Sequence, residues 1–331
     1  MARVLVTGAS GFIGTHVARH LHLIGHEVVA AGRDPARLAV LSAAGLRTRA
    51  ADLCRDPLLP LVDGVEIVVH CAALSSPWGK RELFLAANVL ATERLLEASR
   101  QSGVCRFVHF SSPSIYFRLS DQFNTPEAFE PPPRWINAYA ESKWLGEQCV
   151  RKAVSAGLPS VILRPRAVFG EGDRAIFPRL LALAERGWFP QIGRGEACID
   201  VTYVANVVAA VEACMLLGVP GDGRPFNITN GEPMSVSQLL GHLFSALDLK
   251  VRMIPLPRRL AVALATLAER VANIRPGRPE PRLSRYGVGV LGFSQTLDIS
   301  AARQQLGYAP SVSVVDGIDR YARWWKSHAQ D

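Results

Sequence analysis

Short apolar runs alternate with longer amphipathic stretches through the first half of the chain. Runs of this length that end in glycine or small polar residues predict buried strands, and the stretches between them predict helices. Strands are expected at 2–8, 26–32, 46–53, 65–73, 105–112 and 159–165, and helices at 11–25, at 80–102 and around Tyr139. Because strands and helices alternate and the strand runs are continuously apolar, we expect an α/β fold with a parallel sheet covered on both faces.

The alternation loosens after about residue 171. Prolines occur at 178, 190, 220, 225, 233, 255 and 257, and segments such as "RPGRPEPRLSRYG" predict loops. We therefore expect a sheet domain over 1–170, to which 200–230 returns, and a smaller, mainly ligand-binding lobe over 171–331. The lobe should cover the carboxyl edge of the sheet, where open α/β sheets bind ligands.

One segment of this lobe, 258–275, has the apolar spacing of a helix. Its apolar residues at 260, 261, 264, 267, 268 and 271 fall close to one helical face. Three roles are open for that face: packing against the core of the lobe, lining an entrance, or peripheral contact with a membrane. Packing is the simplest of the three.

The composition is that of a folded protein with a sizeable core, at 331 residues, 49% hydrophobic and 20% charged. No apolar run reaches the roughly 18 residues that a membrane span needs, and no secretory signal is evident. The six cysteines are scattered without metal-ligand spacing, so we expect reduced thiols, no metal and a cytoplasmic location. The net charge of +8 is dispersed and not interleaved with aromatic residues, which argues against a nucleic-acid partner.

The first expected strand runs into "VTGASGFIG", in which Gly8, Gly11 and Gly14 are spaced three apart. A glycine turn between a strand and a helix lets the backbone approach a pyrophosphate, which then lies at the helix N-terminus. The motif stands in the first strand–helix–strand unit of the chain. It therefore predicts a site for a dinucleotide.

The end of the second strand, "AAGRDP", indicates which dinucleotide. An acidic residue is usual there when the ribose 2′-hydroxyl is free, but Gly32 takes that place and Arg33 follows. A guanidinium suits a 2′-phosphate, so we expect NADP(H), with NAD(H) as the alternative if Asp34 contacts the ribose. Asp52, after the third strand, is placed to accept from the adenine amino group.

Tyr139 and Lys143 stand four residues apart in "AYAESKWLGE" and would share one face of a helix. The spacing alone fits an ordinary surface helix as well as a phenol that exchanges a proton beside an ammonium. The second interpretation needs the ammonium to lower the tyrosine pKa, which is about 10 in water.

These motifs, with "CAA", Asn88 in "ANVLAT" and "FSSPSIY", resemble the extended short-chain dehydrogenase/reductase superfamily through almost the whole chain. The resemblance implies a Rossmann-type doubly wound sheet with a smaller C-terminal substrate-binding lobe. It implies that Tyr139 is the acid–base residue and that Lys143 assists it and holds the nicotinamide ribose. Ser112 would hydrogen-bond the reacting oxygen, and Asn88 would help to anchor a proton-relay water. The implied cofactor contacts are Gly8, Ser10, Gly11, Phe12, Ile13, Gly14, Arg33, Asp52, Leu53, Ala72, Ala73, Tyr139, Lys143, Pro165 and Val168.

Three departures narrow the resemblance. Ile199 stands where nucleotide-sugar members commonly carry an arginine, and Pro113 stands where dehydratases carry an acidic residue. Phe117 replaces the usual glycine, which makes the pocket narrower and more apolar. The chain then resembles the 3β-hydroxysteroid dehydrogenases, the sterol C4-decarboxylating dehydrogenases and the bacterial 2-alkyl-3-keto acid reductases. The expected substrate contacts are Trp78, Ser114, Phe117, Phe169 and Trp188, with Trp135 as a further site-facing aromatic.

The resemblance implies an NADP(H)-dependent oxidoreductase that interconverts a ketone and a secondary alcohol. Its substrate would be hydrophobic, of the 3-ketosteroid or long-chain 3-keto acid type. A nucleotide-sugar epimerase or reductase is the first alternative. A nucleotide sensor without catalysis is the second, although a sensor would not need Ser112, Tyr139 and Lys143. Members of the superfamily often dimerise through paired helices, so a homodimer is expected.

Overall fold

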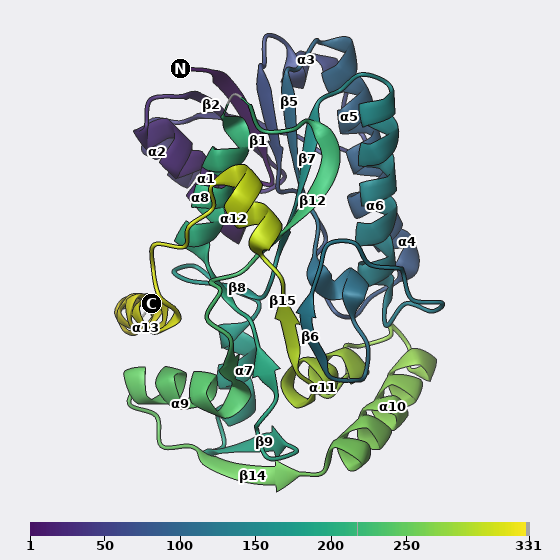
Figure 1. The fold of residues 1–331 in the computed structure, drawn as a ribbon, viewed down its shortest axis with the longest axis vertical. Coiled ribbons are helices and arrows are strands. Elements are labelled where there is room, and N and C mark those ends of the chain that lie inside the picture. The colour runs from purple at the N-terminus through teal and green to yellow at the C-terminus, as the bar shows by residue number, and fades with distance from the viewer. Residues whose placement is uncertain (217, 329–331) are drawn as a thin grey trace.

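A seven-stranded parallel sheet forms the centre of the computed structural model, which describes residues 1–216 and 218–328 (Figure 1). The expected second lobe thus extends into residues 329–331, which lie outside the described part of the chain. In spatial order the strands are β12 (Asp222–Ile228), β7 (Ser160–Pro165), β5 (Arg106–Phe110), β4 (Ile67–His70), β1 (Arg3–Thr7), β2 (Glu27–Gly32) and β3 (Arg47–Ala50).

The strand order reverses at β1, which pairs with β2 on one side and with β4 on the other. In doubly wound sheets the crevice at such a reversal, at the carboxyl ends of the strands, binds the ligand. All residues of β4 and β7 are buried, and this explains why their sequences are continuously apolar up to the last positions. The Rossmann-type fold expected from the alternating pattern is confirmed.

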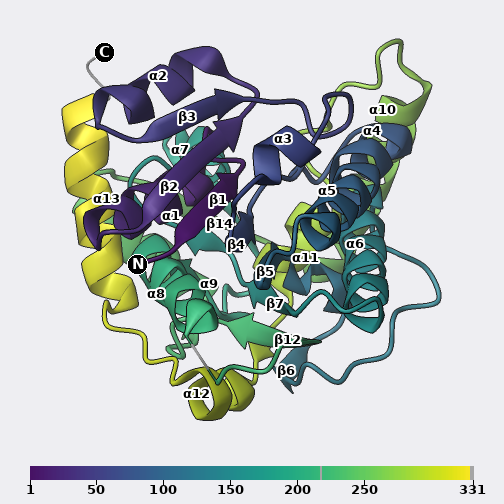
Figure 2. The ribbon, with the colours of Figure 1, turned by 90° about the horizontal axis from the view of Figure 1, so that it is seen from above.

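Helices cover both faces of the sheet, as Figure 2 makes clear from above. On one face α1 (Phe12–Leu23) and α8 (Val204–Met215) pack through a shared apolar cluster that includes Val17 and Val207. On the other face α5 (Ala91–Gln101) and α6 (Ala138–Ser155) pack through a cluster that includes Leu95 and Val150. The shorter helices of this domain are α2 (Pro35–Ala43), α3 (Leu59–Val62), α4 (Arg81–Leu85), the π-helix η1 (Ala86–Leu90) and the 3₁₀ helix η2 (Pro113–Tyr116).

Most of the rest of the chain forms a lobe beyond the carboxyl ends of the strands, at the bottom of Figure 1. Within the expected lobe, however, α12 (Ser300–Leu306) packs on the sheet domain, because its Ala302 and Leu306 belong to the same apolar cluster as Val207. Within 200–230, α8 and β12 belong to the sheet domain, since β12 pairs with β7. Small sheets link the two parts: β6 (Gln122–Thr125), from the sheet domain, pairs with β15 (Gln295–Leu297). The other elements are β8 (Val168–Phe169), α7 (Phe177–Ala184), β9 (Trp188–Ile192), β10 (Cys198–Ile199), β11 (Thr202–Tyr203), β13 (Met234–Ser235), α9 (Val236–Ala246), β14 (Arg252–Leu256), α10 (Arg258–Ile274), α11 (Arg285–Gly292) and α13 (Val314–His328).

Helix α10 forms where the apolar spacing predicted it, but it is not oriented as simple packing would require. Its buried positions are alanines, Ala261, Ala265 and Ala272, whereas its large apolar side chains point to solvent. The exposed set is Leu260 (49% exposed), Leu264 (44%), Leu267 (59%), Val271 (36%) and Ile274 (83%). Among the described residues, no helix is both long enough and apolar enough to span a bilayer.

Candidate active site

The backbone of the glycine turn after β1 packs so closely that a Cβ has no room at Gly8 or at Gly14. Gly8 has a φ of +68°, and a Cβ on it would lie 2.6 Å from the amide nitrogen of Ala72. A Cβ on Gly14 would lie 2.2 Å from the carbonyl oxygen of Gly8. Gly11, the N-cap of α1, supplies no side-chain acceptor, and the first turn holds no acidic residue. The free N–H groups of this turn suit a pyrophosphate.

The basic segment after β2 adjoins this turn. Arg33 is exposed, and the Asp34 carboxylate accepts from the Arg37 backbone N–H (3.2 Å) and pairs with its guanidinium (3.1 Å). Asp34 is therefore engaged as the N-cap of α2. A Cβ on Gly32 would lie 2.5 Å from the Ser10 hydroxyl oxygen. This close approach explains glycine at position 32, and the sequence alone did not reveal it.

The other expected cofactor contacts surround the same crevice. Leu53 is buried, and the Asp52 carboxylate accepts from the Cys54 backbone N–H at 2.9 Å. Ala72 and Ala73 follow β4, and Ala72 packs against the glycine turn. The remaining positions lie on α1 (Phe12 and Ile13), at the end of β7 (Pro165) and at the start of β8 (Val168).

Tyr139 lies in the first turn of α6, whose N-cap Asn137 accepts from the Ala140 backbone N–H at 2.9 Å. Burial raises the pKa of the Tyr139 phenol above its usual value, and contacts with the hydroxyls of Ser112 and Ser75 oppose the rise. The structure therefore brings Tyr139 and Ser112 together as expected. Ser75 had no signal in the sequence, because it follows "CAAL" in a loop.

Lys143 is buried on the same helix, and its Nζ donates to the carbonyl oxygen of Phe110 at 2.6 Å. Burial lowers the pKa of this ammonium to about 8, although Glu147 acts in the opposite direction. Lys143 is not among the groups that lower the pKa of Tyr139 in this conformation, so the expected effect of its charge on the phenol stays a prediction. The phenol is desolvated, and the ammonium is bonded to the backbone instead.

Asn88 lies in the π-helix η1, which interrupts the helix expected over 80–102. Its side-chain amide donates to Ser142 Oγ (2.8 Å) and to the Leu74 carbonyl (3.1 Å), and it accepts from the Leu74 N–H (2.7 Å). The loop after β4 is thereby tied to α6. Single π-turns inside α-helices are frequent at functional sites, and this one turns Asn88 into the interior.

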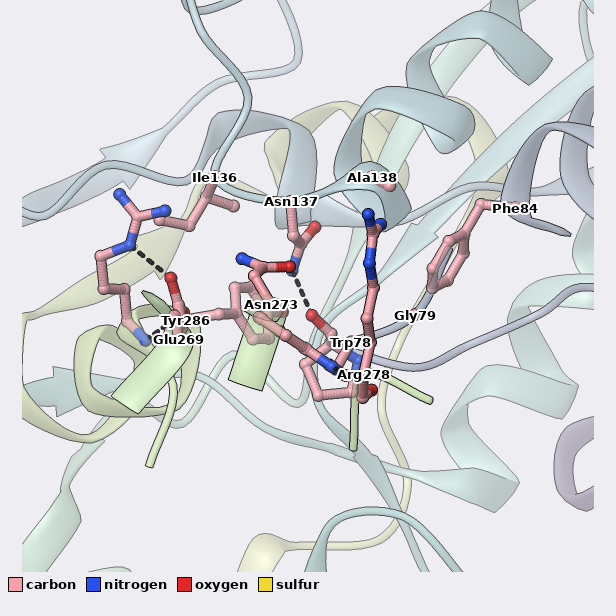
Figure 3. A pocket seen from close by; sticks show the side chains of 12 residues that line it. Trp78, Gly79, Phe84, Ile136, Asn137, Ala138, Glu269, Asn273, Arg278 and Tyr286 are labelled. Carbon is pink, nitrogen blue, oxygen red and sulfur yellow. Dashed lines mark hydrogen bonds and ion pairs between the residues drawn. The ribbon is translucent and has the colours of Figure 1, made fainter. Parts of the chain in front are cut away.

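A cavity of about 150 Å³ opens between the sheet domain and the lobe (Figure 3). Trp78, Phe84 and Tyr286 line it, and the Phe84 ring lies 6.4 Å from the ring of Tyr139. The Trp78 indole donates to the Arg278 carbonyl at 3.0 Å and so ties the loop after β4 to the segment after α10. Glu269 of α10 pairs with Arg285 of α11 at 2.7 Å on the same wall. Trp78 thus lies where a substrate contact was expected.

The other expected substrate contacts are distributed differently. Phe117 is buried and packs on Tyr286 with ring centroids 5.0 Å apart, and Ser114 is buried beneath it in η2. Phe169 is fully buried in the core of the lobe and stacks on Phe177, so its predicted contact with substrate is wrong. Trp188 extends from β9 toward solvent and does not line the cavity between the sheet domain and the lobe.

A known protein family matches the greater part of this chain. The family model described as "NAD dependent epimerase/dehydratase family" matches residues 4–229. The chain belongs to the NAD dependent epimerase/dehydratase family. Membership accounts for the glycine turn after β1 and for Tyr139 and Lys143 on one helix.

Relatives of this family cover nearly the whole chain. "Uncharacterized protein YbjS" of Escherichia coli (strain K12) is 34% identical, covering 99% of each chain. "2-alkyl-3-oxoalkanoate reductase" of Stenotrophomonas maltophilia (strain K279a) is 31% identical, covering 96% of this chain and 98% of the relative. "Sterol-4-alpha-carboxylate 3-dehydrogenase, decarboxylating" of Mus musculus is 28% identical over 95% and 88%. The chain is an NAD(P)-dependent oxidoreductase of the extended short-chain type.

A solved structure of the family has the same fold. UDP-glucuronic acid 4-epimerase from Bacillus cereus, in complex with NAD, superposes with a TM-score of 0.78 at 23% identity. The match covers 98% of this chain and 99% of the epimerase. It establishes the architecture, whereas the reaction depends on the residues of the crevice.

Proposed function

We propose that the protein is an NADP(H)-dependent oxidoreductase that interconverts a ketone and a secondary alcohol on a hydrophobic substrate. The observation that carries the proposal is the contact of the Tyr139 phenol with Ser112 beside a cavity lined by Trp78 and Phe84. The printed names of two relatives, a 3-oxoalkanoate reductase and a sterol 3-dehydrogenase, support this reaction and a substrate of the long-chain 3-keto acid or steroid type.

Different residues of the chain would assist different steps of carbonyl reduction. The hydroxyls of Ser112 and Tyr139 would hydrogen-bond the carbonyl oxygen, and Tyr139 would deliver the proton to it. A bound nicotinamide supplies the hydride to the carbonyl carbon. Lys143, which donates to a backbone carbonyl here, would hold the nicotinamide ribose and stabilise the phenolate with its charge. Asn88, bonded to Ser142 and Leu74, keeps the loop after β4 in place.

We propose NADP(H) as the preferred cofactor because the segment after β2 is basic and its carboxylate is engaged. Asp34 caps α2 and pairs with Arg37, which leaves the exposed Arg33 to meet a 2′-phosphate. Gly32 packs on Ser10 and offers no acceptor to a ribose 2′-hydroxyl. NAD(H) remains the alternative, and a direct comparison of the two cofactors decides between them.

A nucleotide-sugar epimerase is the second candidate function, favoured by the fold shared with UDP-glucuronic acid 4-epimerase. The departures at Ile199, which is buried in β10, and at Phe117, which closes one side of the crevice, disfavour a diphosphate there. A nucleotide sensor is the third candidate. A homodimer and a cytoplasmic location remain proposals that rest on the sequence.

The test is turnover with a defined panel. The protein is incubated with NADPH and, separately, with 3-ketosteroids, long-chain 3-keto acids and UDP-sugars, while absorbance of the reduced cofactor is followed. We expect oxidation of the cofactor with a hydrophobic ketone and none with a UDP-sugar. Epimerisation of a UDP-sugar without net cofactor oxidation would select the epimerase, and binding of the cofactor without any turnover would select the sensor.

Tyr139→Phe isolates the proton donor. The variant keeps the ring and loses the hydroxyl, so we expect turnover to fall by at least about a hundredfold, the lower end of what a general acid contributes. Cofactor affinity should stay within about twofold of wild type. The control is Tyr308→Phe, which removes a buried tyrosine hydroxyl bonded to the Thr229 carbonyl (2.9 Å), away from the crevice. Equal turnover in Tyr139→Phe and Tyr308→Phe would refute the assignment.

A further inference from the structure

Two buried arginines, Arg164 near the end of β7 and Arg166 just after it, have very different surroundings. Arg164 is 1% exposed, and its guanidinium makes a bidentate pair with Glu147, with distances of 2.7 and 2.6 Å. It also donates to the Glu127 carbonyl at 3.0 Å. This cation is neutralised within the core, as buried charges generally are.

Arg166 is nearly as buried, at 4% exposed, but it has no such partner. Its Nη2 donates to the Gln295 side-chain oxygen at 2.5 Å. No carboxylate in the described part of the chain forms an ion pair with it. Asp200 acts on it only through space, and the Asp200 carboxylate accepts from the Leu297 N–H at 2.7 Å. Burial lowers the pKa of this guanidinium, whereas at Arg164 the hydrogen bonds and charge of Glu147 outweigh burial and raise the pKa.

Two N–H donors lack acceptors, one on this guanidinium and one on Gln295. The Nε of Arg166 and the Nε2 of Gln295 are buried without a hydrogen-bond partner in the structure. Both residues line a second, small cavity together with Phe117. A buried cation and two unsatisfied N–H donors around one space form a site for an acceptor that carries negative charge.

The second cavity adjoins the cavity beside Tyr139. Phe117 lines the second cavity and packs on Tyr286, which lines the first. Tyr286 is close enough to both Arg166 and Tyr139 for each to influence the pKa of its phenol, which burial raises. The rings of Phe117 and Tyr286 therefore separate the cavity beside Tyr139 from the cavity lined by Arg166.

We propose that Arg166, oriented by Gln295, binds a carboxylate of the substrate a short distance from the carbon that reacts at Tyr139. The guanidinium presents its donors in a planar fork that matches a carboxylate, and a low-dielectric site strengthens the pair. The second cavity, at about 10 Å³, has room for one water-sized group. A carboxylate therefore enters when the Phe117–Tyr286 pair turns aside. This inference rests on the proposed function and defines its substrates as hydrophobic 3-oxo or 3-hydroxy acids.

The test compares an acid with its neutral isostere in the oxidative direction, because 3-hydroxy acids do not lose carbon dioxide as 3-keto acids do. Wild-type protein with NADP⁺ is given a long-chain 3-hydroxyalkanoate and, separately, the matching 3-hydroxyalkanamide. We expect kcat/KM to be about ten- to a hundredfold higher for the acid, the range of a charge-assisted hydrogen bond. Equal values for acid and amide would overturn the inference without any variant being made.

Variants then test whether Arg166 causes the preference for the acid over the amide. Arg166→Gln should raise KM for the acid about ten- to a hundredfold, leave the amide within about threefold, and abolish the preference. Arg166→Lys, which keeps the charge, should restore part of it. The control is Arg100→Gln, which removes the same charge from an exposed arginine paired with Glu97 (2.8 Å) on α5 and should leave the ratio unchanged. Near-normal cofactor affinity and thermal unfolding temperature show that a variant is folded.

Two results separate this inference from the proposed function. If neither substrate is oxidised while NADP⁺ binds, the proposed function fails. If both are oxidised and the ratio of acid to amide is the same in wild type and Arg166→Gln, the proposed function stands and the inference fails. In that case Arg166 and Gln295 are satisfied by a buried water.

Discussion

The protonation of Lys143 depends on its burial in the folded chain. Burial moves its pKa from 10.5 to about 8, while the unfolded chain keeps the ordinary value. Between about pH 8 and pH 10.5 the unfolded chain therefore holds a proton that the folded chain has lost. The contribution of Lys143 to the free energy of unfolding thus rises with pH through this window, and below it the buried charge is a constant cost.

Activity should show the opposite trend to stability. If the ammonium form holds the ribose and stabilises the phenolate, kcat falls as pH rises through about 8. The measurement is a kcat profile from pH 6 to pH 10 with saturating cofactor. A kcat that stays level up to pH 10 would contradict the role given to the Lys143 charge.

Arg33 is expected to decide between the two cofactors. A guanidinium–phosphate pair contributes about 1.5–3 kcal/mol, so wild type should bind NADPH about ten- to a hundredfold more tightly than NADH. Arg33→Gln should remove that preference by weakening NADPH alone. The single change is preferable to Gly32→Asp, since a side chain at position 32 would displace Ser10 from the cofactor turn.

Titration of both reduced cofactors into wild type, Arg33→Gln and Arg49→Gln checks this prediction. Arg49 is an exposed arginine on the neighbouring strand β3 and serves as the control for loss of one positive charge. Equal affinities for NADH and NADPH in wild type would mean that Arg33 is an ordinary surface residue.

Among the helices, α10 buries alanines and exposes its leucines, the opposite of what its apolar spacing predicted. Its large side chains lie in an exposed stripe at the spacing of successive helical turns, 260, 264, 267, 271 and 274. Exposed arginines stand on the same helix and at its end, at positions 259, 270 and 275, whereas Arg258 pairs with Asp121 (3.2 Å). We propose that α10 lies on an anionic membrane surface, because an apolar face bordered by cations matches a bilayer with acidic headgroups.

Vesicle sedimentation tests this proposal. Wild type should bind phosphatidylcholine vesicles that contain phosphatidylglycerol more strongly than pure phosphatidylcholine vesicles, and added salt should weaken the binding. Replacing Leu264 and Leu267 with Gln removes apolar area from the stripe and should reduce binding about tenfold or more. Leu23→Gln, at an exposed leucine of α1 (82% exposed), is the control. Failure of wild type to bind acidic vesicles would exclude the membrane.

At the scale of the whole molecule, the buried pair of Arg164 and Glu147 joins the sheet to α6. Glu147 is fully buried, and Arg164 donates to it through two nitrogens while also contacting Tyr116 of η2. Removal of one partner leaves a buried charge uncompensated. Glu147→Gln should therefore lower the free energy of unfolding by about 3–5 kcal/mol.

Urea denaturation measures that loss. Glu97→Gln, which breaks an exposed pair with Arg100 (2.8 Å), is the matched control and should cost at most about 1 kcal/mol. Similar losses in the two variants would show that the Arg164–Glu147 pair does not hold the sheet and α6 together.

The alternating pattern predicted the elements of the sheet domain, and the resemblance predicted which residues meet around Tyr139. Continuous apolar runs predicted the buried strands correctly because both faces of a parallel sheet are covered. The glycine turn was readable because a tight approach of backbone to backbone admits no other residue, as at Gly8 and Gly14. The contact between Tyr139 and Ser112 was predictable only through the resemblance, since Ser112 follows β5 whereas Tyr139 lies on α6, far along the chain.

The surroundings of those residues became visible only in the folded structure. Apolar residues look alike in a sequence, so it did not reveal that Phe169 is core, that Trp188 faces solvent, or that α10 buries alanines and exposes leucines. Two arginines two residues apart at the end of β7 also look equivalent, but their partners differ. Glu147 neutralises Arg164, whereas Arg166 is left unpaired at the cavity. Charge state and exposure depend on contacts between distant segments, and no local pattern records them.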